Sequence, residues 1–411
     1  MEMIGVASLL RVMPAGYEEA CFSTGAIIRK RDIKDPNDLM MLALFHLLTG
    51  CSLIEVSEIS KLAKLGDISD VAFMKRFSNC NEWFKWILAA IQNTTPGIIH
   101  YSIPEKLSKY RILAVDASDV AEKGASGRIF RLHFALDIGN MQAALYNITS
   151  NSTGEHLRNF ELAKGDLVIA DRIYSSITGI EYCLSKDCQY IARMRANSFK
   201  PYNAEGKQLD LLSIITEKDS GELNAFVRKE RGENAGKLIP VRICFKKKDA
   251  DALDSTRKKM KRKESKKQAK ISASTYIFNE YIVVATSLDA NITAEEVIEL
   301  YRYRWQVELY FKRLKSILRY GELQKKSEKS AFSWLNGKLM IALLIESILG
   351  NADFPPSMMN SRSIWRETKL VMLLLRGNIA DPLNVIGNIA FGLQVEKRRK
   401  KRPLQMTTIL S

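Results

Sequence analysis

The sequence predicts a mixed α/β core in which helices cover a central sheet, with a helical region before it, a mostly β insertion within it and a helical region after it. Two short apolar runs, 112–116 and 166–171, each end in an aspartate. Strands that are apolar on both sides suit the centre of a sheet covered by helices. Two alternating segments between them, 130–137 and 141–148, are typical of antiparallel neighbours of the first strand.

The region before the core, residues 1–105, is expected to be helical. Apolar residues recur there at helical spacing over 38–48, 52–65 and 69–91. The second and third of these segments join at a tight turn around Gly66 and resemble a helix-turn-helix. A plain helical bundle is the alternative.

The core continues after its three antiparallel strands. The pattern predicts a helix, a strand, a second helix and a fifth strand, at about 155–162, 166–171, 177–185 and 189–194. The order β-β-β-α-β-α-β is that of a ribonuclease-H-like domain. We assign residues 106–198 to the first part of this domain and 291–350, which carries the closing helix, to its second part.

The closing helix places one carboxylate on a basic surface. At about 100° per residue, four side chains fall within an arc of about 60°: Tyr301, Arg304, Glu308 and Lys315. Thr293 and Glu296 form a predicted capping box at its start, and Gly321 is expected to cap its end. One side of the helix therefore presents an acid flanked by two cations.

Three carboxylates, those of Asp116, Asp171 and Glu308, are expected to converge from two strand ends and this helix. They cannot all stay ionised without positive charge nearby, because close like charges raise one another's pKa. Two divalent ions about 3.5 to 4 Å apart supply that charge and stabilise both oxygens of an in-line phosphoryl displacement. A ligand set made only of oxygen atoms favours Mg²⁺ or Mn²⁺.

Asp119 and Asp137 are alternatives for the first of these positions. Asp116 is favoured because it directly follows the apolar run, whereas Asp119 is expected in the turn beyond it. Asp137 is better explained as part of a hairpin turn with Gly139 and Asn140.

The spacing of these residues resembles that of a known family. The pattern Tyr301-x2-Arg304-x3-Glu308-x6-Lys315, with Asp116 and the segment Asp171-Arg-x-Tyr174, is similar to the Asp-Asp-Glu (DDE) transposases of bacterial insertion sequences. The resemblance is to the insertion-sequence-four family, which has the Tyr-Arg-Glu-Lys signature. It extends from near residue 35 through the basic helices after residue 308.

This resemblance implies a bacterial, cytoplasmic and nucleoid-associated DNA transposase. The three carboxylates match the family's metal-binding triad, and Tyr301, Arg304 and Lys315 match residues that hold the backbone of the transposon end. Family members act as homodimers on double-stranded DNA. They bind the terminal inverted repeats, cleave the strands there with bound metal ions and transfer them into target DNA. The helical region at 1–105 is then expected to bind the repeats.

Residues 199–290 depart from the minimal core pattern and match the family's mostly β insertion, with strand-like segments at 223–228, 239–245 and 281–285. Nine of the sixteen residues between 255 and 270 are basic: Arg257, Lys258, Lys259, Lys261, Arg262, Lys263, Lys266, Lys267 and Lys270. So dense a run is expected to be flexible until it meets DNA phosphate, with a solubilising tract as the alternative.

The resemblance also implies an aromatic side chain that stacks on a base flipped out near the cleavage site. Tyr281 is the nearest candidate and Tyr276 is the alternative, although simple strand packing is the favoured explanation for either residue. Residues 351–411 are expected to form a helical region that ends in a basic tail at 397–402.

Composition sets limits on the class of protein. The chain has 62 Lys and Arg residues against 46 Asp and Glu, a formal charge of +16, which indicates a polyanionic partner. No apolar run reaches the roughly 18 to 20 residues that cross a bilayer, because Glu346 interrupts the longest one, 339–349. Position 2 is acidic and no cleavable signal pattern follows, which predicts a cytoplasmic protein. The six cysteines lack zinc-like spacing and are expected to be reduced, mostly buried thiols.

These observations predict a transposase that cleaves the ends of an insertion sequence and transfers the strands to target DNA. Two alternatives share parts of the pattern. One is a ribonuclease-H-like endonuclease without strand transfer, and the other is a catalytically inactive, transposase-derived DNA-binding protein.

Overall fold

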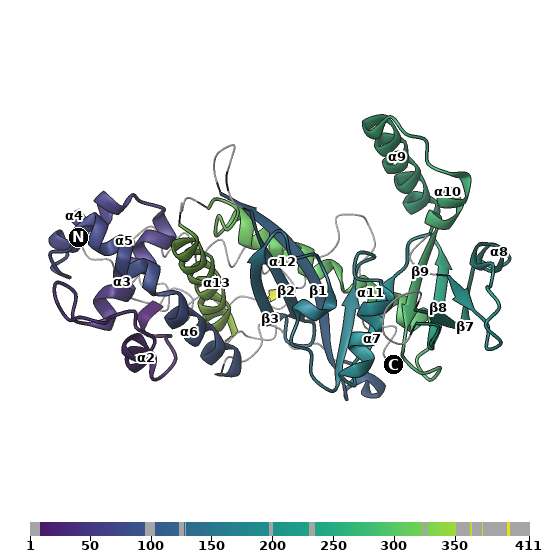
Figure 1. The fold of residues 1–411 in the computed structure, drawn as a ribbon, viewed down its shortest axis with the longest axis horizontal. Helices are drawn as coiled ribbons and strands as arrows, with labels where there is room; N and C mark the ends of the chain where they lie inside the picture. Colours follow the sequence, from purple (N-terminus) through teal and green to yellow (C-terminus); the bar gives the residue numbers. More distant parts are fainter. Residues whose placement is uncertain are drawn as a thin grey trace.

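The computed structural model describes residues 9–94, 103–122, 127, 129–196, 200–229, 235–323 and 327–350, with 362–363, 372 and 393–394 beyond them. Along the longest axis of the molecule, a group of helices is followed by the central sheet and then by the insertion (Figure 1). The predicted helical region and basic tail at 351–411 lie almost wholly outside the described residues.

One sheet forms the centre of the described structure. Its nine strands follow the order β3-β2-β1-β4-β5-β9-β8-β7-β6. Their bounds are β1 Arg111–Ala121, β2 Ile129–Asp137, β3 Gln142–Ser150, β4 Asp166–Ala170, β5 Gln189–Arg193, β6 Pro201–Tyr202, β7 Ser220–Arg228, β8 Leu238–Lys247 and β9 Tyr281–Thr286. The first five are the predicted core strands: β1 to β3 are antiparallel, and β4 and β5 run parallel to β1. This mixed sheet with flanking helices is compatible with the predicted ribonuclease-H-like fold.

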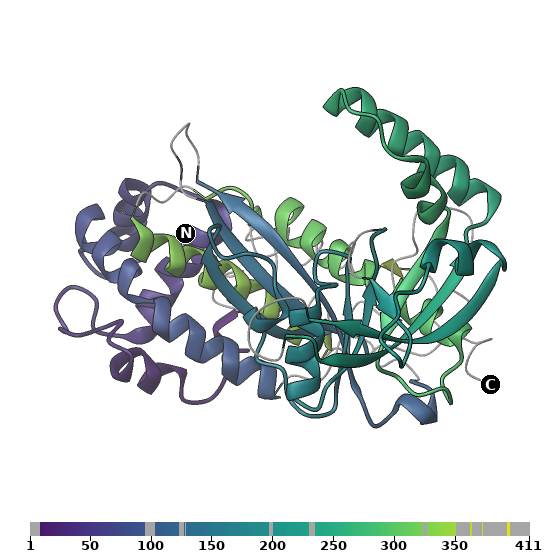
Figure 2. The ribbon, with the colours of Figure 1, turned by 45° about the vertical axis from the view of Figure 1, so that its right-hand side comes forward.

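The segment predicted to be an insertion, residues 199–290, contributes strands to the same sheet. Strand β9 pairs antiparallel with β5, and β8, β7 and β6 extend the sheet from there. Two helices, α9 (Ala250–Lys267) and α10 (Ala273–Asn279), connect β8 to β9 and project away from the sheet in both views (Figures 1 and 2). We call this pair of helices the arm.

Alternation along β1 assigns its side chains to two different cores. Ile112 and Ala114 belong to the core that contains Tyr310, whereas Leu113 and Val115 belong to the core on the other side of the sheet. Because successive side chains point to opposite faces of a strand, Asp116 lies on the same face as Ala114. Helix α12 (Trp305–Ser316) packs on that face, and α7 (Ile177–Ser185) contributes to the other core.

The N-terminal helices pack around one long helix of the core. They are α2 (Tyr17–Ser23), α3 (Pro36–Thr49), α4 (Leu53–Leu62), α5 (Asp70–Asn79) and α6 (Asn81–Thr94), and α13 (Glu328–Gly350) contacts α3, α5 and α6. The single helix predicted at 69–91 is therefore two helices, because α5 ends at a cap on Cys80.

Helix α13 corrects one prediction about membranes. Its segment Glu328–Ile348 is long and apolar enough to cross a bilayer, although the sequence was expected to contain no such run. The charge of Glu346 was given too much weight, because the other residues of the helix keep the mean hydropathy high. Since 94% of the apolar window is buried inside the protein, this is a core helix of the fold.

Two predicted segments have a different conformation. The helix expected at 155–162 is only a short 3₁₀ turn, η2 (Leu157–Asn159). His156 accepts a hydrogen bond from the backbone N–H of Arg158, and Asn159 donates one to the carbonyl of Gly154. Such local side-chain bonds compete with helix formation.

The basic run expected to be flexible is instead helix α9. Asp249 caps its first turn, and Lys258 pairs with Asp254 at i,i+4 spacing (2.7 Å). Glu264 accepts a hydrogen bond from the hydroxyl of Tyr276 in α10 (2.7 Å). The prediction of flexibility was wrong because lysine and arginine are good helix formers once a cap and a packing partner offset their mutual repulsion.

The single helix predicted around Glu308 is also two helices. The capping box of Thr293 and Glu296 is confirmed at the start of α11 (Ala294–Arg302). The backbone N–H groups of Tyr303 and Arg304 then bond to carbonyls three residues earlier, a tighter turn than an α-helix allows. Helix α12 begins at Trp305 and ends at Ser316, so Gly321 does not cap it.

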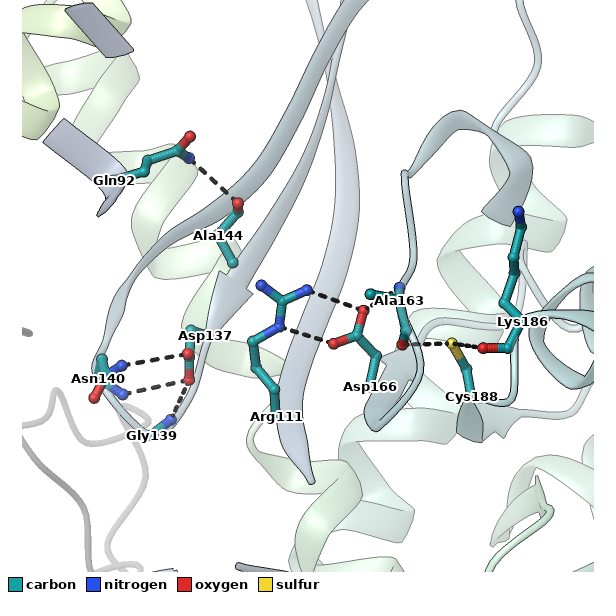
Figure 3. Close-up of polar contacts among 10 residues, drawn as sticks. All are labelled: Gln92, Arg111, Asp137, Gly139, Asn140, Ala144, Ala163, Asp166, Lys186 and Cys188. Carbon is teal, nitrogen blue, oxygen red and sulfur yellow. Dashed lines mark hydrogen bonds and ion pairs between the residues drawn. The ribbon is translucent and has the colours of Figure 1, made fainter. Parts of the chain in front are cut away.

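Polar contacts fix the ends of β1, β2 and β4 that lie away from Asp171 (Figure 3). Arg111 donates two hydrogen bonds to Asp166, at 2.8 and 3.0 Å. Asp137 accepts hydrogen bonds from the backbone N–H groups of Gly139 (2.8 Å) and Asn140 (3.4 Å). The turn predicted for Asp137 is confirmed.

The six cysteines are free thiols, five of them buried and Cys51 partly so. This matches the expectation of reduced, mostly buried thiols.

Candidate active site

Two of the three predicted acids lie at adjacent positions on neighbouring strands. Val115 of β1 pairs with Ala170 of β4, so the next residues, Asp116 and Asp171, lie side by side at the same level of the sheet. Asp171 directly follows its strand, as predicted. Asp116 does not, because β1 continues to Ala121.

Glu308 approaches these two acids from helix α12. It lies in the first turn of that helix. Phe134, the cross-strand partner of Asp116, stacks on Tyr310 with ring centroids 4.4 Å apart. This contact holds the beginning of α12 over the part of β1 that carries Asp116.

A single guanidinium lies between two of the acids. Arg304 forms an ion pair with Asp116 (Nη1 to Oδ2, 3.6 Å) and another with Glu308 at Oε1. Its side chain is only 12% exposed. The hydroxyl of Tyr301 donates to Oδ1 of Asp171 at 3.4 Å. All three acids are therefore held by residues of the α11–α12 junction.

Burial and nearby charges shift the pKa values of Asp116 and Asp171 in opposite directions. Burial raises the pKa of Asp116 to about 6, opposed by Arg304 and reinforced by the charges of Asp171 and Glu308. Burial also tends to raise the pKa of Asp171, but Arg304 and the adjacent Arg172 hold it below its ordinary value. Additional positive charge would fully ionise Asp116 at neutral pH.

The chemistry of this group suits divalent cations, although the acids are not arranged around one point. Within the described ranges, no three His, Cys, Asp or Glu side chains lie close enough together to hold one metal ion. Asp116, Asp171 and Glu308 nevertheless offer only oxygen donors, which suit Mg²⁺ or Mn²⁺. The positive charge that these acids require is now supplied by Arg304.

The alternatives to Asp116 point elsewhere. Asp119 lies within β1 rather than in the predicted turn, because the strand is longer than its apolar run. It pairs with Arg131 at 2.7 Å, on the face of the sheet opposite to α12. Asp137 is the cross-strand partner of Leu113, which lies three residues before Asp116 on β1. It is therefore at the strand ends that Figure 3 shows, away from Asp171.

Lys315 lies at the far end of helix α12. Its ammonium donates to the backbone carbonyl of Asp119 at 3.2 Å, and its side chain is exposed. Lys315 is therefore about two turns beyond Glu308 on the same side of α12, whereas Tyr301 and Arg304 precede that helix.

Several charged residues near Asp171 were missed by the sequence reasoning. Burial lowers the pKa of Arg172, as do the nearby charges of Arg193 and Arg195. Glu155 lies close enough to Asp171 for the two charges to interact, and burial raises its pKa. Arg172 comes two residues after β4, Arg193 ends β5 and Arg195 lies just beyond it. A search for charged residues at the ends of the predicted strands could have found them.

The two candidate stacking tyrosines have other contacts. Tyr281 begins β9 with its side chain only 4% exposed, inside the core on the α7 side of the sheet. Tyr276 bonds to Glu264 within the arm. The contact of Tyr281 is the strand packing that was the other explanation, whereas Tyr276 lies on a helix and not on a strand.

The arm displays most of the basic run to solvent. In α9, Met260 is buried, whereas these cations are exposed: Arg257, Lys258, Lys259, Lys261, Arg262, Lys263, Lys266 and Lys267. Arg257 also pairs with Glu280 at 2.5 Å, at the base of the arm. The cations occupy every side of the helix except the strip that faces α10.

Comparisons with known proteins found transposases. The family model described as "Transposase DDE domain" matches residues 107–344. InsL of insertion sequence element IS186A, from Escherichia coli (strain K12), is 28% identical over 349 residues, covering 84% of this chain and 93% of the relative. The transposase for insertion sequence element IS421, from Escherichia coli, is 28% identical over 350 residues with the same coverage. The transposase for IS231F, from Bacillus thuringiensis subsp. israelensis, is 25% identical over 204 residues, covering 46% of this chain and 42% of the relative.

Proposed function

Because the matched domain covers more than half of its length, the chain belongs to the DDE transposase family, and we propose that it cuts the ends of its own insertion sequence and joins them to target DNA. The observation that carries this proposal is the group of three carboxylates, of which two pair with one largely buried guanidinium and the third accepts a hydrogen bond from Tyr301. Asp116, Asp171 and Glu308 come from three separate elements, and Arg304 links two of them. A shared role explains why the fold brings these partly buried acids near one another.

Asp116, Asp171 and Glu308 would hold two Mg²⁺ or Mn²⁺ ions. Bound ions of this kind activate the attacking oxygen and stabilise the leaving oxygen in phosphoryl displacement. The protein's own part is to fix the acids on rigid elements and to position the DNA backbone. Tyr301 orients Asp171, and the fork of Arg304 matches the geometry of a phosphate. Lys315 would contact the backbone farther along α12.

The division of the chain follows from the same proposal. Residues 1–105 bind the terminal inverted repeats, with α4 and α5 as a helix-turn-helix. Residues 106–198 and 291–350 form a ribonuclease-H-like catalytic core of the insertion-sequence-four type, and 199–290 form its insertion. Residues 351–411 complete the chain. Two subunits act together, each binding one end and cleaving the other.

A strand-joining assay tests this function. DNA that carries the element's own ends, taken from the sequence flanking its reading frame, is incubated with the protein, Mg²⁺ and a supercoiled plasmid. Insertion of the end DNA into the plasmid is expected. Cleavage without insertion would identify an endonuclease, and binding without cleavage would identify an inactive DNA-binding protein.

The arm is proposed to hold DNA through phosphate contacts. Replacing Lys259 and Lys263 by Gln should flatten the dependence of DNA affinity on salt. The slope of log K against log salt changes by about 0.9 per phosphate contact, so a decrease of about 2 is expected. Fluorescence anisotropy between 50 and 200 mM salt measures this slope.

The matched control replaces Lys164 and Lys186 by Gln. Both side chains are exposed. Lys164 precedes β4 and Lys186 follows α7, so both lie away from the end of β4 that is followed by Asp171. This pair should leave the slope unchanged. An equal decrease in both variants would indicate general charge rather than a contact made by the arm.

A further inference from the structure

Arg304 occupies an unusual position for a residue expected to bind DNA. Its guanidinium is 12% exposed and is paired with Asp116 and Glu308. A phosphate could reach it only if the guanidinium turned away from at least one of these acids, because it is largely enclosed where it lies beside them.

The same position conflicts with cation binding. A guanidinium beside Asp116 and Glu308 occupies the space in which a divalent ion would contact them. It would also repel the ion, because charges a few ångströms apart interact strongly in a site with little water. The described residues contain no group of three donors ready to hold an ion, which agrees with this competition.

The side chain of Arg304 is not needed to cap the helix that follows it. Arg304 precedes the first residue of α12, in the turn that separates it from α11, and its side chain makes no capping bond to that helix. Asp171 has its own hydrogen bond from Tyr301. Movement of the Arg304 side chain would therefore free Asp116 and Glu308, and Asp171 would lose a nearby positive charge but keep its hydrogen bond from Tyr301.

We infer that Arg304 is a built-in counter-ion: it holds Asp116 and Glu308 when DNA is absent, and it transfers to a DNA phosphate so that the acids can take up divalent cations. This inference rests on the proposed function. It makes cation binding and DNA binding mutually dependent, because each favours the state in which Arg304 has left the acids. Metal-dependent cleavage would then be restricted to protein that is already bound to DNA.

Direct titration of the full-length protein with Mn²⁺, without DNA, tests this inference. Arg304→Gln removes the competing charge and should bind Mn²⁺ about tenfold more tightly than the unchanged protein, a size typical of coupled sites. Arg304→Lys keeps the charge but loses the fork, and should give a smaller gain. Water proton relaxation reports the bound Mn²⁺. A purely structural loss would weaken binding, so a gain is specific to the counter-ion role.

Two controls separate the possible outcomes. Arg302→Gln, two residues away and paired with Glu299 (2.6 Å), should bind Mn²⁺ like the unchanged protein. Asp171→Asn should bind it more weakly in every background. If neither Arg304 variant binds more tightly while Asp171→Asn still weakens binding, the counter-ion role is wrong and the proposed metal site stands. If Asp171→Asn has no effect, the metal site itself is wrong.

Discussion

Glu308→Gln is expected to lower Mg²⁺-dependent cleavage of end DNA by about 10³-fold or more while leaving DNA affinity nearly unchanged. Glutamine keeps the size of the side chain but removes the charge that would hold a metal ion. A loss of several kcal/mol of transition-state stabilisation corresponds to a rate loss of this size. Because Glu308 is in the first turn of α12 and part exposed, the substitution should not disturb the core.

Cleavage of labelled end DNA and anisotropy binding, measured on the same preparation, give the two quantities. Glu299→Gln is the matched control, since Glu299 lies on α11 and pairs only with the neighbouring Arg302 among the contacts described for it. Turnover at the normal rate by the Glu308 variant would remove Glu308 from the site. Loss of binding together with cleavage would indicate a folding defect instead.

The strands of the core could be predicted because their signals are local. The run before Asp171 is apolar and short, and β4 ends where the run ends. Alternation at 130–137 and 141–148 likewise gave β2 and β3. The pairing of the insertion with β5 was less accessible, because strand partners far apart in sequence leave no local pattern.

The details of the site depend on contacts that cannot be derived from the spacing of residues along the chain. The turn at Tyr303 and Arg304 breaks a pattern that looks continuous, because the packing of α11 and α12 on different parts of the sheet requires a change of direction. Arg304 therefore lies at the helix junction rather than on one helical face. Its pairing with two acids was not predicted, since Arg304 was expected to hold the DNA backbone and the two acids were expected to share metal ions.

For the arm, the sequence predicted less regular structure than the protein has. Nine basic residues in sixteen indicated disorder because repulsion within the run is obvious from the sequence. The stabilising contacts come from residues outside the run, such as Asp249 at the cap and Tyr276 in the second helix. Each of these contacts is modest, and only their combination makes the helix stable.

Gly66→Ala is expected to destabilise the N-terminal helices by about 3 kcal/mol or more. Gly66 has φ of 145° in the turn between α4 and α5, and a Cβ there would lie 2.4 Å from the backbone oxygen of Asp32. A backbone atom cannot move aside as a side chain can. The turn is also fixed by the hydroxyl of Ser60, which donates to the carbonyl of Gly66 at 2.6 Å.

Gly50→Ala provides the comparison that separates steric conflict from backbone strain. Gly50 caps α3 with φ of 73°, and a Cβ at that position would have no atom within 4 Å. Only the left-handed conformation is then penalised, by about 1 to 2 kcal/mol. Urea unfolding of the two variants should therefore differ by at least about 1 kcal/mol, with Gly66→Ala the less stable. Equal losses would mean that the segment around Asp32 yields to the new methyl group, and that the α4–α5 turn is not held by this close approach.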